Sequence, residues 1–246
     1  MLLEASRHCG HIKRFIHVST DEVYGENDET AENEGQFNEA QTTMSPTNPY
    51  AATKAGAEML CNSYKISYNL PIIITRGNNV YGPRQYPEKL IPKFIQLAMA
   101  DRKFTVHGEG QQQRSYMYVE DVAEAFCFVL HKGLTGEIYN IGTLHERTVM
   151  SVASEICKCF GMDPKDQIVH VRDRLFNDAR YWMDNAKLRA LGWEERTSWE
   201  EGFKATVDWY KANKDGHWPS IVNALAAHPG DALEAQNAGS LTGGSA

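Results

Sequence analysis

The chain has 246 residues, 42% hydrophobic and 23% charged, which is enough for one large domain or two small ones around an apolar core. Its formal net charge of −7 argues against nucleic acid or an anionic membrane as a partner, because both favour clustered Lys and Arg. No apolar run is as long as a membrane span, and residues 1–10 lack the apolar stretch of a secretory signal. We therefore expect a cytoplasmic protein whose partner is a small molecule.

The first half of the chain alternates between helical and strand patterns. In chain order, it predicts a helix ending near residue 9, a buried strand over 14–20, an acid-rich loop over 21–39, a helix over 50–68 and a strand over 72–75. Strand, helix, strand in this order favours a parallel sheet.

Farther along the chain the alternation becomes less regular. Helices are predicted over 89–100 and 118–133, a strand over 136–142, and two more helices over 148–161 and 198–213. The second half therefore resembles a smaller lobe more than a continuation of the sheet.

The cysteines are Cys9, Cys61, Cys127, Cys157 and Cys159. This odd number comes without Cys-x-x-C pairs or the His spacing of a zinc site. We expect free thiols in a reducing compartment, and no metal.

Tyr50 and Lys54 stand four residues apart in a predicted helix, so their side chains share one face about one turn apart. A phenol is a weak base at neutral pH, but a nearby ammonium favours the phenolate and lowers the phenol pKa toward the working range. The pair predicts a general base, although the same spacing is common in ordinary helices.

A hydroxyl and two carboxylates, those of Thr20, Asp21 and Glu22, follow the strand predicted over 14–20. Ligands of open α/β sheets bind at this carboxyl end of the strands. Adjacent carboxyls should differ in pKa, so that one stays protonated as an acid while the other acts as a base. Both reach one ligand only if the backbone turns there, because consecutive strand residues point to opposite faces. The structural alternative is that Asp21 caps the turn and Glu22 is solvated.

Six segments of the sequence carry a family resemblance. In chain order they read STDEVYG, NPYAATKAGAE, TRGNNVYGPRQYPEKLIPKFI, HGEGQQQRSYMYVEDVAEAF, EIYNIGT and RDRLFNDARYWMD. Over most of its length the chain resembles the nucleotide-sugar 4,6-dehydratases of the extended short-chain dehydrogenase/reductase superfamily. Its motifs most resemble those of the plant-type UDP-glucose 4,6-dehydratase that forms part of rhamnose synthase. The dTDP-glucose 4,6-dehydratases are close relatives of that enzyme.

The resemblance implies conversion of UDP-glucose or dTDP-glucose to the 4-keto-6-deoxy sugar, in rhamnose biosynthesis. Tyr50, helped by Lys54 and Thr20, would take the C4 hydroxyl proton while NAD accepts the C4 hydride. Glu22 would then remove the C5 proton, Asp21 would protonate the leaving C6 hydroxyl, and the hydride would return to C6. Tyr50 and Lys54 would also contact NAD, with Lys54 at the nicotinamide ribose.

Eight further residues would bind the substrate by the same resemblance. They are Asn79, Glu88, Lys89, Leu90, Arg114, Arg174, Asn177 and Arg180. Guanidinium groups can hold a diphosphate through two parallel hydrogen bonds, although a surface salt bridge is the alternative for any one arginine.

The implied fold class is α/β, with an incomplete Rossmann-like parallel sheet whose N-terminal strands are missing, beside a smaller mixed α/β lobe. We assign residues 1–86 and 115–143 to the NAD-binding Rossmann part, 87–114 and 144–230 to the substrate-binding lobe, and 231–246 to a disordered tail. The family forms homodimers through two helices per subunit, and we expect part of that interface to be missing.

The sequence contains no Gly-x-x-Gly-x-x-Gly turn, at which members of the superfamily bind the dinucleotide pyrophosphate. We therefore expect this chain alone to show neither NAD binding nor a 4-keto product. Two hypotheses remain open. The chain is either a dehydratase present as a fragment, or a non-catalytic remnant that binds a nucleotide sugar or a full-length partner.

Overall fold

A computed structural model describes residues 1–25, 36–173, 183–214, 217–218 and 220–226. The chain forms two compact units. The first comprises Met1–Gly82, Gln112–Arg147 and Asp178–Gly202, and the second Pro83–Gln111, Thr148–Asn177 and Phe203–Ala246. This grouping differs from the division made from sequence, because residues 178–202 belong to the first unit. The tail expected over 231–246 lies outside the described residues.

The first unit is built on a parallel sheet of β1 (Phe15–Thr20), β2 (Ile72–Gly77) and β6 (Ile138–Ile141), in the order β1-β2-β6. Thr20 pairs with Gly77, and Gly77 pairs with Ile141, so the three strands end level with one another. The parallel sheet predicted from sequence is confirmed, and side chains that follow these strands share one edge.

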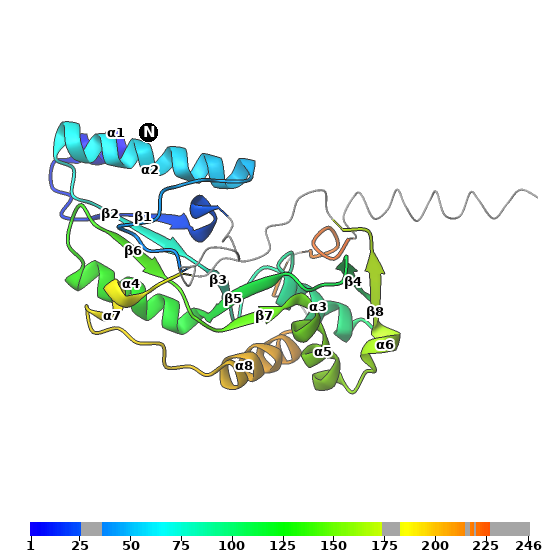
Figure 1. The fold of residues 1–246 in the computed structure, drawn as a ribbon. Coiled ribbons are helices and arrows are strands. Elements are labelled where there is room, and N and C mark those ends of the chain that lie inside the picture. The colour runs from blue at the N-terminus through cyan, green and yellow to red at the C-terminus, as the bar shows by residue number, and fades with distance from the viewer. Residues whose placement is uncertain (26–35, 174–182, 215–216, 219, 227–246) are drawn as a thin grey trace, which may run out of the picture. The chain divides into compact units, whose positions relative to one another are not determined.

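Helices cover both faces of this sheet (Figure 1). On one face, α1 (Leu2–Cys9) and α2 (Pro49–Tyr68) pack through Leu3, Cys61 and Tyr64 on apolar strand residues. On the other, α4 (Val119–Lys132) and α7 (Ala186–Arg189) form the larger core. Its fully buried members are Ile73, Met117, Ala125, Val129, Tyr139, Ile141, Leu188 and Trp193. This burial explains why the strands read as nearly continuous apolar runs.

Helix α2 has capping residues at both ends. The Asn48 side chain accepts a hydrogen bond from the Ala51 amide at 2.8 Å, and Pro49 occupies the first helical position. Asn69 ends the helix in the left-handed conformation, with φ of 53°. These caps fix where the helix begins, and therefore where Tyr50 and Lys54 lie.

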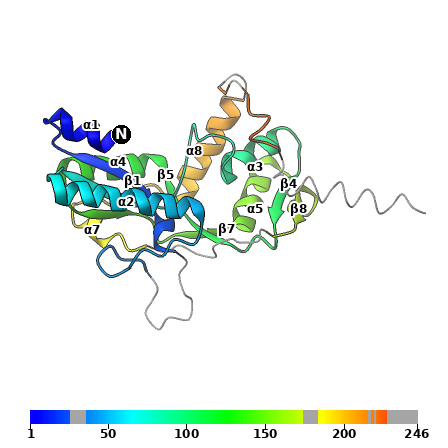
Figure 2. The ribbon, with the colours of Figure 1, turned by 90° about the horizontal axis from the view of Figure 1, so that it is seen from above.

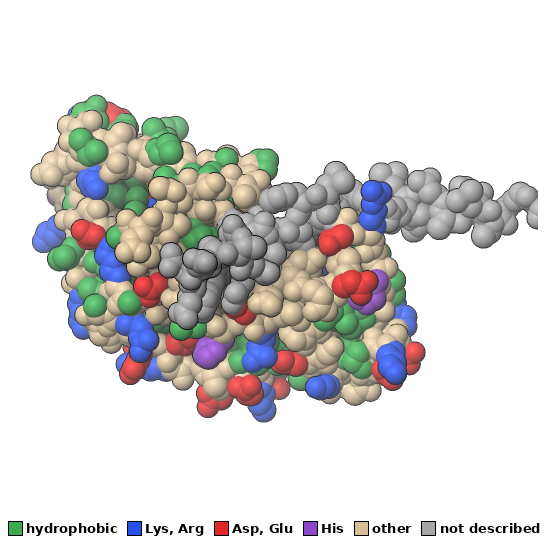
Figure 3. Space-filling view, in the orientation of Figure 1, with side chains coloured by type: hydrophobic (Ala, Val, Ile, Leu, Met, Phe, Trp, Pro, Cys, Tyr) green, Lys and Arg blue, Asp and Glu red, His purple; other side chains and the backbone are tan. Residues whose placement is uncertain are grey.

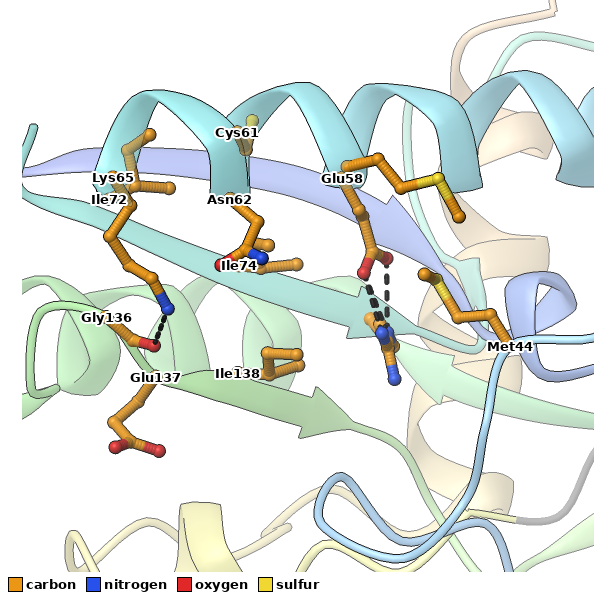
Figure 4. A pocket seen from close by; sticks show the side chains of 12 residues that line it. Met44, Glu58, Cys61, Asn62, Lys65, Ile72, Ile74, Gly136, Glu137 and Ile138 are labelled. Carbon is orange, nitrogen blue, oxygen red and sulfur yellow. Dashed lines mark hydrogen bonds and ion pairs between the residues drawn. The ribbon is translucent and has the colours of Figure 1, made fainter. Parts of the chain in front are cut away.

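A buried ion pair joins α2 to β2 (Figure 4). Arg76 donates two hydrogen bonds to Glu58 Oε2 and one to Oε1, the shortest at 2.7 Å, and its guanidinium lies 4.4 Å from the centre of the Tyr24 ring. The pair lines a cavity of about 210 Å³ whose other walls include Met44, Cys61 and Ile74.

A short turn and three further strands extend the first unit beyond the sheet. A 3₁₀ turn, η1 (Asp21–Tyr24), follows β1 directly, and β3 (Asn79–Tyr81) pairs in parallel with β5 (Gln113–Tyr118). Strand β7 (Glu146–Thr148) continues this second sheet in the order β3-β5-β7. Helix α8 (Trp199–Ala212) begins in this unit, where Trp199 packs on Tyr81.

The second unit contains a two-stranded parallel sheet, β4 (Phe104–His107) with β8 (Ile168–Val171). Helices α3 (Leu90–Met99) and α5 (Val149–Phe160) belong to it (Figure 2), as does α6 (Pro164–Gln167), which Figure 1 labels. The rings of Phe94 and Phe104 stack at 4.8 Å. Strands β4 and β8 were not predicted from the sequence.

All five cysteines are free thiols, as the sequence predicts, with Cys61 and Cys157 buried. Within the described part of the chain, none of the helices combines the length and apolar character that crossing a bilayer demands.

Candidate active site

The backbone turns immediately after β1. Thr20 is the last extended residue, with φ −138° and ψ 154°, and its Oγ1 accepts a hydrogen bond from the Glu22 amide at 3.4 Å. Thr20 therefore caps the turn, which differs from the alternative in which Asp21 is the cap. This turn at the strand end is the condition under which two consecutive acids can face one ligand.

Asp21 is a buried carboxyl, only 4% exposed, with a hydrogen bond to each oxygen. Thr20 Oγ1 donates to Oδ1 at 3.0 Å, and Asn78 Nδ2 donates to Oδ2 at 2.7 Å. Burial raises the pKa of Asp21 to about 6, against the opposing effect of these two bonds. Near neutral pH this group can therefore give up or take a proton.

Glu22 is held by the start of α2. Its Oε2 accepts a hydrogen bond from Asn48 Nδ2 at 2.8 Å, while Asn48 Oδ1 caps the helix. Glu22 is half-buried and is not merely solvated. One asparagine thus couples the position of the second acid to the first turn of the helix that carries Tyr50.

Tyr50 lies beside the acid pair, with 55% of its surface exposed. Burial and the negative charges of Glu22 and Asp21 raise its pKa, and a hydrogen bond with the Thr20 side chain opposes this rise. Because these effects act over short range, the phenol, the threonine hydroxyl and both carboxyls share one region at the end of β1.

Lys54 is turned toward the strand in this structure. Its Nζ donates to the Val18 carbonyl oxygen at 2.6 Å. Lys54 is not among the groups that shift the pKa of Tyr50 in this structure, so its effect on the phenol stays a prediction. The acids and the partly buried position of the ring dominate instead.

The substrate-binding residues predicted from sequence are spread over both units. Asn79 is exposed at the start of β3, and Arg114, on β5, donates to the Gln113 carbonyl at 2.7 Å. In the second unit, Lys89 precedes the first turn of α3 and lies 3.5 Å from Glu88, and Leu90 begins that helix. Arg174, Asn177 and Arg180 lie outside the described residues. The structure thus groups Thr20, Asp21, Glu22 and Tyr50, with Lys54 beside the same strand. The substrate-binding roles of the eight residues stay predictions.

Sequence reasoning missed two polar residues of the site, Asn48 and Asn78. Asn48 could have been found as the N-cap before Pro49. Asn78 follows β2 at the edge where the acids follow β1, so the rule that selected Asp21 also applies to it. The neighbouring Asn79 was named for another role, substrate binding, by the family resemblance.

Comparisons with known proteins identify this arrangement. Residues 1–206 match the family described as GDP-mannose 4,6 dehydratase. The chain belongs to this family. Membership of the GDP-mannose 4,6 dehydratase family confirms the resemblance seen in the sequence, and the fold is that of Rossmann-type dehydratases and epimerases.

One curated relative has a dehydratase among its three activities. The trifunctional UDP-glucose 4,6-dehydratase/UDP-4-keto-6-deoxy-D-glucose 3,5-epimerase/UDP-4-keto-L-rhamnose-reductase of Arabidopsis thaliana is 57% identical over 229 residues, which cover 93% of this chain and 34% of that protein. The chain thus spans about a third of the length of this relative.

Two solved structures also resemble the chain. The dTDP-glucose 4,6-dehydratase of Bacillus anthracis, in complex with NAD, gives a TM-score of 0.79 at 39% identity, over 87% of this chain and 66% of that one. The dTDP-glucose 4,6-dehydratase of Streptomyces venezuelae, with NAD and TYD bound, gives 0.81 at 36% identity, over 87% and 64%.

Proposed function

We propose that the chain carries the catalytic residues of an NAD-dependent nucleotide-sugar 4,6-dehydratase, a lyase that removes water from a hexose. The observation that carries the proposal is the cluster of a phenol, a hydroxyl and two unlike carboxyls at the end of β1. Loss of water from a 4-keto sugar needs one proton removed at C5 and one supplied at the C6 hydroxyl. Two adjacent carboxyls, of which Asp21 is buried and Glu22 is held by an amide, supply that combination.

The roles follow from position. Tyr50, the exposed phenol, takes the proton of the C4 hydroxyl, with Thr20 donating to Asp21 and lowering the pKa of the phenol. Glu22 removes the C5 proton. Asp21, whose pKa of about 6 exceeds that of an ordinary Asp, donates to the departing C6 hydroxyl.

The residues at the end of β1 fit the nicotinamide end of NAD. When bound, NAD supplies the hydride acceptor for C4 and the hydride donor for C6. Lys54 has three N–H donors, and the bond to the Val18 carbonyl uses one, so two remain for ribose hydroxyls. No residues are proposed here for the pyrophosphate, because the sequence has no Gly-x-x-Gly-x-x-Gly turn.

The substrate is proposed to be UDP-glucose, in rhamnose biosynthesis. The 57% identity to the plant UDP-glucose enzyme supports UDP over dTDP, the nucleotide of the two solved relatives. The diphosphate and sugar contacts proposed from the resemblance are those of Asn79, Glu88, Lys89, Leu90, Arg114, Arg174, Asn177 and Arg180.

The test inserts this chain in place of the matching 229-residue region of the Arabidopsis relative and measures the 4-keto sugar made from UDP-glucose and dTDP-glucose. Tyr50→Phe should lower the rate about 10²–10⁴-fold, the usual contribution of a general base. Tyr68→Phe, at the other end of α2, is the matched control and should leave the rate unchanged.

The double variant Asp21→Asn/Glu22→Gln separates the two half-reactions. It should still form NADH, seen by its absorbance, while releasing no water. A normal rate of 4-keto-6-deoxy product from this variant would show that the pair does not carry the elimination.

The second hypothesis for the chain by itself is a non-catalytic remnant that binds a nucleotide sugar or a full-length partner. Assaying the same chain alone distinguishes the two. Product only from the inserted chain supports competent catalytic residues in a chain that does not turn over by itself. Product from the chain alone contradicts the expectation of inactivity, and a folded insert without product contradicts the dehydratase proposal.

A homodimer is proposed through the α1 and α2 surface. Leu2, Met59, Leu60 and Ile66 are exposed there, and Figure 3 shows apolar side chains on this part of the first unit. Sedimentation should give a dimer that Ile66→Glu weakens, and a monomeric wild-type chain would contradict it.

Five free thiols support a reducing compartment such as the cytoplasm, which fractionation of the source cells would test.

A further inference from the structure

Asn78 occupies the end of the central strand of the first sheet. It follows β2 directly, and the residue is 8% exposed. Its backbone N–H donates to the Ile141 carbonyl oxygen at 3.1 Å. Because the sheet order is β1-β2-β6, residue 78 stands between the residues that follow β1 and those that follow β6. Its side chain bonds to both.

The backbone on the β6 side determines which way the amide points. The Thr143 amide N–H donates to Asn78 Oδ1 at 3.1 Å, and an N–H can only donate, so Oδ1 must face Thr143. The Nδ2 group is then left to donate to Asp21 Oδ2 at 2.7 Å. The orientation of the amide therefore follows from the fold.

Thr143 is itself fixed. It is fully buried, its Oγ1 donates to Glu195 Oε2 at 2.7 Å, and the same oxygen accepts from the His145 amide at 3.2 Å. Gly142 gives the Asn78 amide its room, since a Cβ on Gly142 would come within 2.5 Å of Asn78 Oδ1. Consecutive hydrogen bonds therefore connect Glu195, through Thr143 and Asn78, to Asp21.

We infer that Asn78 is a positioning residue for the elimination step, whose amide holds the Asp21 carboxyl and stabilises the negative charge left on it when it protonates the departing hydroxyl. The inference rests on the proposed function for the identity of that step. The hydrogen bond becomes charge-assisted as the carboxylate forms, so it is stronger after proton donation than before. Asn78 thus favours the state that donation produces.

Two readouts test the inference in Asn78→Leu, a substitution of similar size without polar atoms. The first is the titration of Asp21 in the chain itself, followed by carboxyl-carbon NMR after labelling aspartate and assigned by the signal lost in Asp21→Asn. Losing a hydrogen bond to a carboxylate should move the Asp21 midpoint upward by about one pH unit or more. Asn62→Leu, an exposed asparagine of α2, is the matched control and should not move it.

Gly142→Ala is a second variant that leaves residue 78 unchanged, in case Asn78→Leu does not fold. Its added methyl group should displace the Asn78 side-chain amide, and the Asp21 midpoint should shift in the same direction. Asn78→Asp should raise the midpoint further than Asn78→Leu, since it sets a second carboxylate against Asp21. An Asp21 midpoint that is unchanged in both Asn78→Leu and Asn78→Asp overturns the inference.

The second readout is the pH dependence of turnover in the inserted chain. Asn78→Leu should lower kcat at least tenfold with little change in KM, and the basic limb of the kcat profile should move to higher pH, because Asp21 keeps its proton longer. A merely damaged fold would lower kcat without moving the limb. A shifted midpoint with wild-type kcat also overturns the inference, whereas failure of the proposed function would appear as no product from the insert carrying Asn78.

Discussion

Glu58 and Asp21 are two carboxyls of the first unit with nearly equal burial and opposite surroundings. Glu58 is 2% exposed and faces the guanidinium of Arg76. It accepts three hydrogen bonds from this guanidinium. Asp21 is 4% exposed, and its carboxyl accepts from neutral donors, the Thr20 hydroxyl and the Asn78 amide, while the negative charge of Glu22 adds to the rise in its pKa. A buried carboxylate beside a fixed cation has its charge compensated, but one beside neutral donors retains much of its desolvation cost.

The comparison indicates why only one of the two suits proton transfer. The Arg76 pair is a structural link between α2 and β2 that also supports the Tyr24 ring. Asp21 instead has a pKa raised to about 6 by burial, so its proton is exchangeable near neutral pH. Because the two carboxyls are almost equally buried, their different suitability for proton transfer comes from the groups around them.

Breaking the Arg76–Glu58 pair should have the largest effect on stability. Arg76→Met leaves an unpaired buried carboxylate, and we expect it to lower the free energy of unfolding by about 3–5 kcal/mol, measured by urea denaturation. The double variant Arg76→Met/Glu58→Leu should recover much of that loss. Arg7→Met, which breaks the exposed pair with Glu4, is the matched control and should leave the free energy of unfolding almost unchanged. A double variant as unstable as the single one would contradict the uncompensated-charge explanation.

The pH dependence of Asp21 should come next. Its folded pKa of about 6 lies above the ordinary value of 3.8, so the folded state binds more protons between these values. Stability from this group is therefore present below pH 4 and is lost as pH rises through 6, by about 3 kcal/mol at most. Wild type should lose more unfolding free energy than Asp21→Asn between pH 4 and pH 7. Parallel curves for the two proteins would contradict the raised pKa.

The same two acids show what the sequence can and cannot predict. Asp21 was found because it follows a β-branched run at the carboxyl end of a strand, and α2, β1 and β2 were found because their apolar patterns are long. Glu58 was not found, since its partner lies 18 residues away on another element and no local pattern joins them. Strands β3, β4 and β8 have three or four residues, too few for a clear alternation.

Within the site, the residues that were missed also have a physical explanation. Asn78 follows β2 as Asp21 follows β1, but the end of a strand is uncertain by a residue, and alternation reverses the side chain at each step. Lys54 shares a helix face with Tyr50, as its spacing predicts, but the Val18 carbonyl that it contacts belongs to the backbone and leaves no mark in the sequence. Position on a face could be predicted, whereas the partner of each polar group required the fold.

The smallest effect on stability is expected at Asn48. The side-chain NH2 of Asn48 donates to Glu22, and its side-chain oxygen caps α2. Asn48→Ala should lower the free energy of unfolding by about 1 kcal/mol through loss of the N-cap, measured by urea denaturation. Asn48→Ser keeps a capping oxygen but has no amide to donate to Glu22, so its stability should stay within a few tenths of a kcal/mol of wild type. If the bond to Glu22 matters for C5 proton removal, both variants should lower dehydratase turnover of the inserted chain to a similar degree. Asn48→Ser with full turnover would mean that Glu22 is held well enough without this amide, and that Asn48 acts on α2 alone.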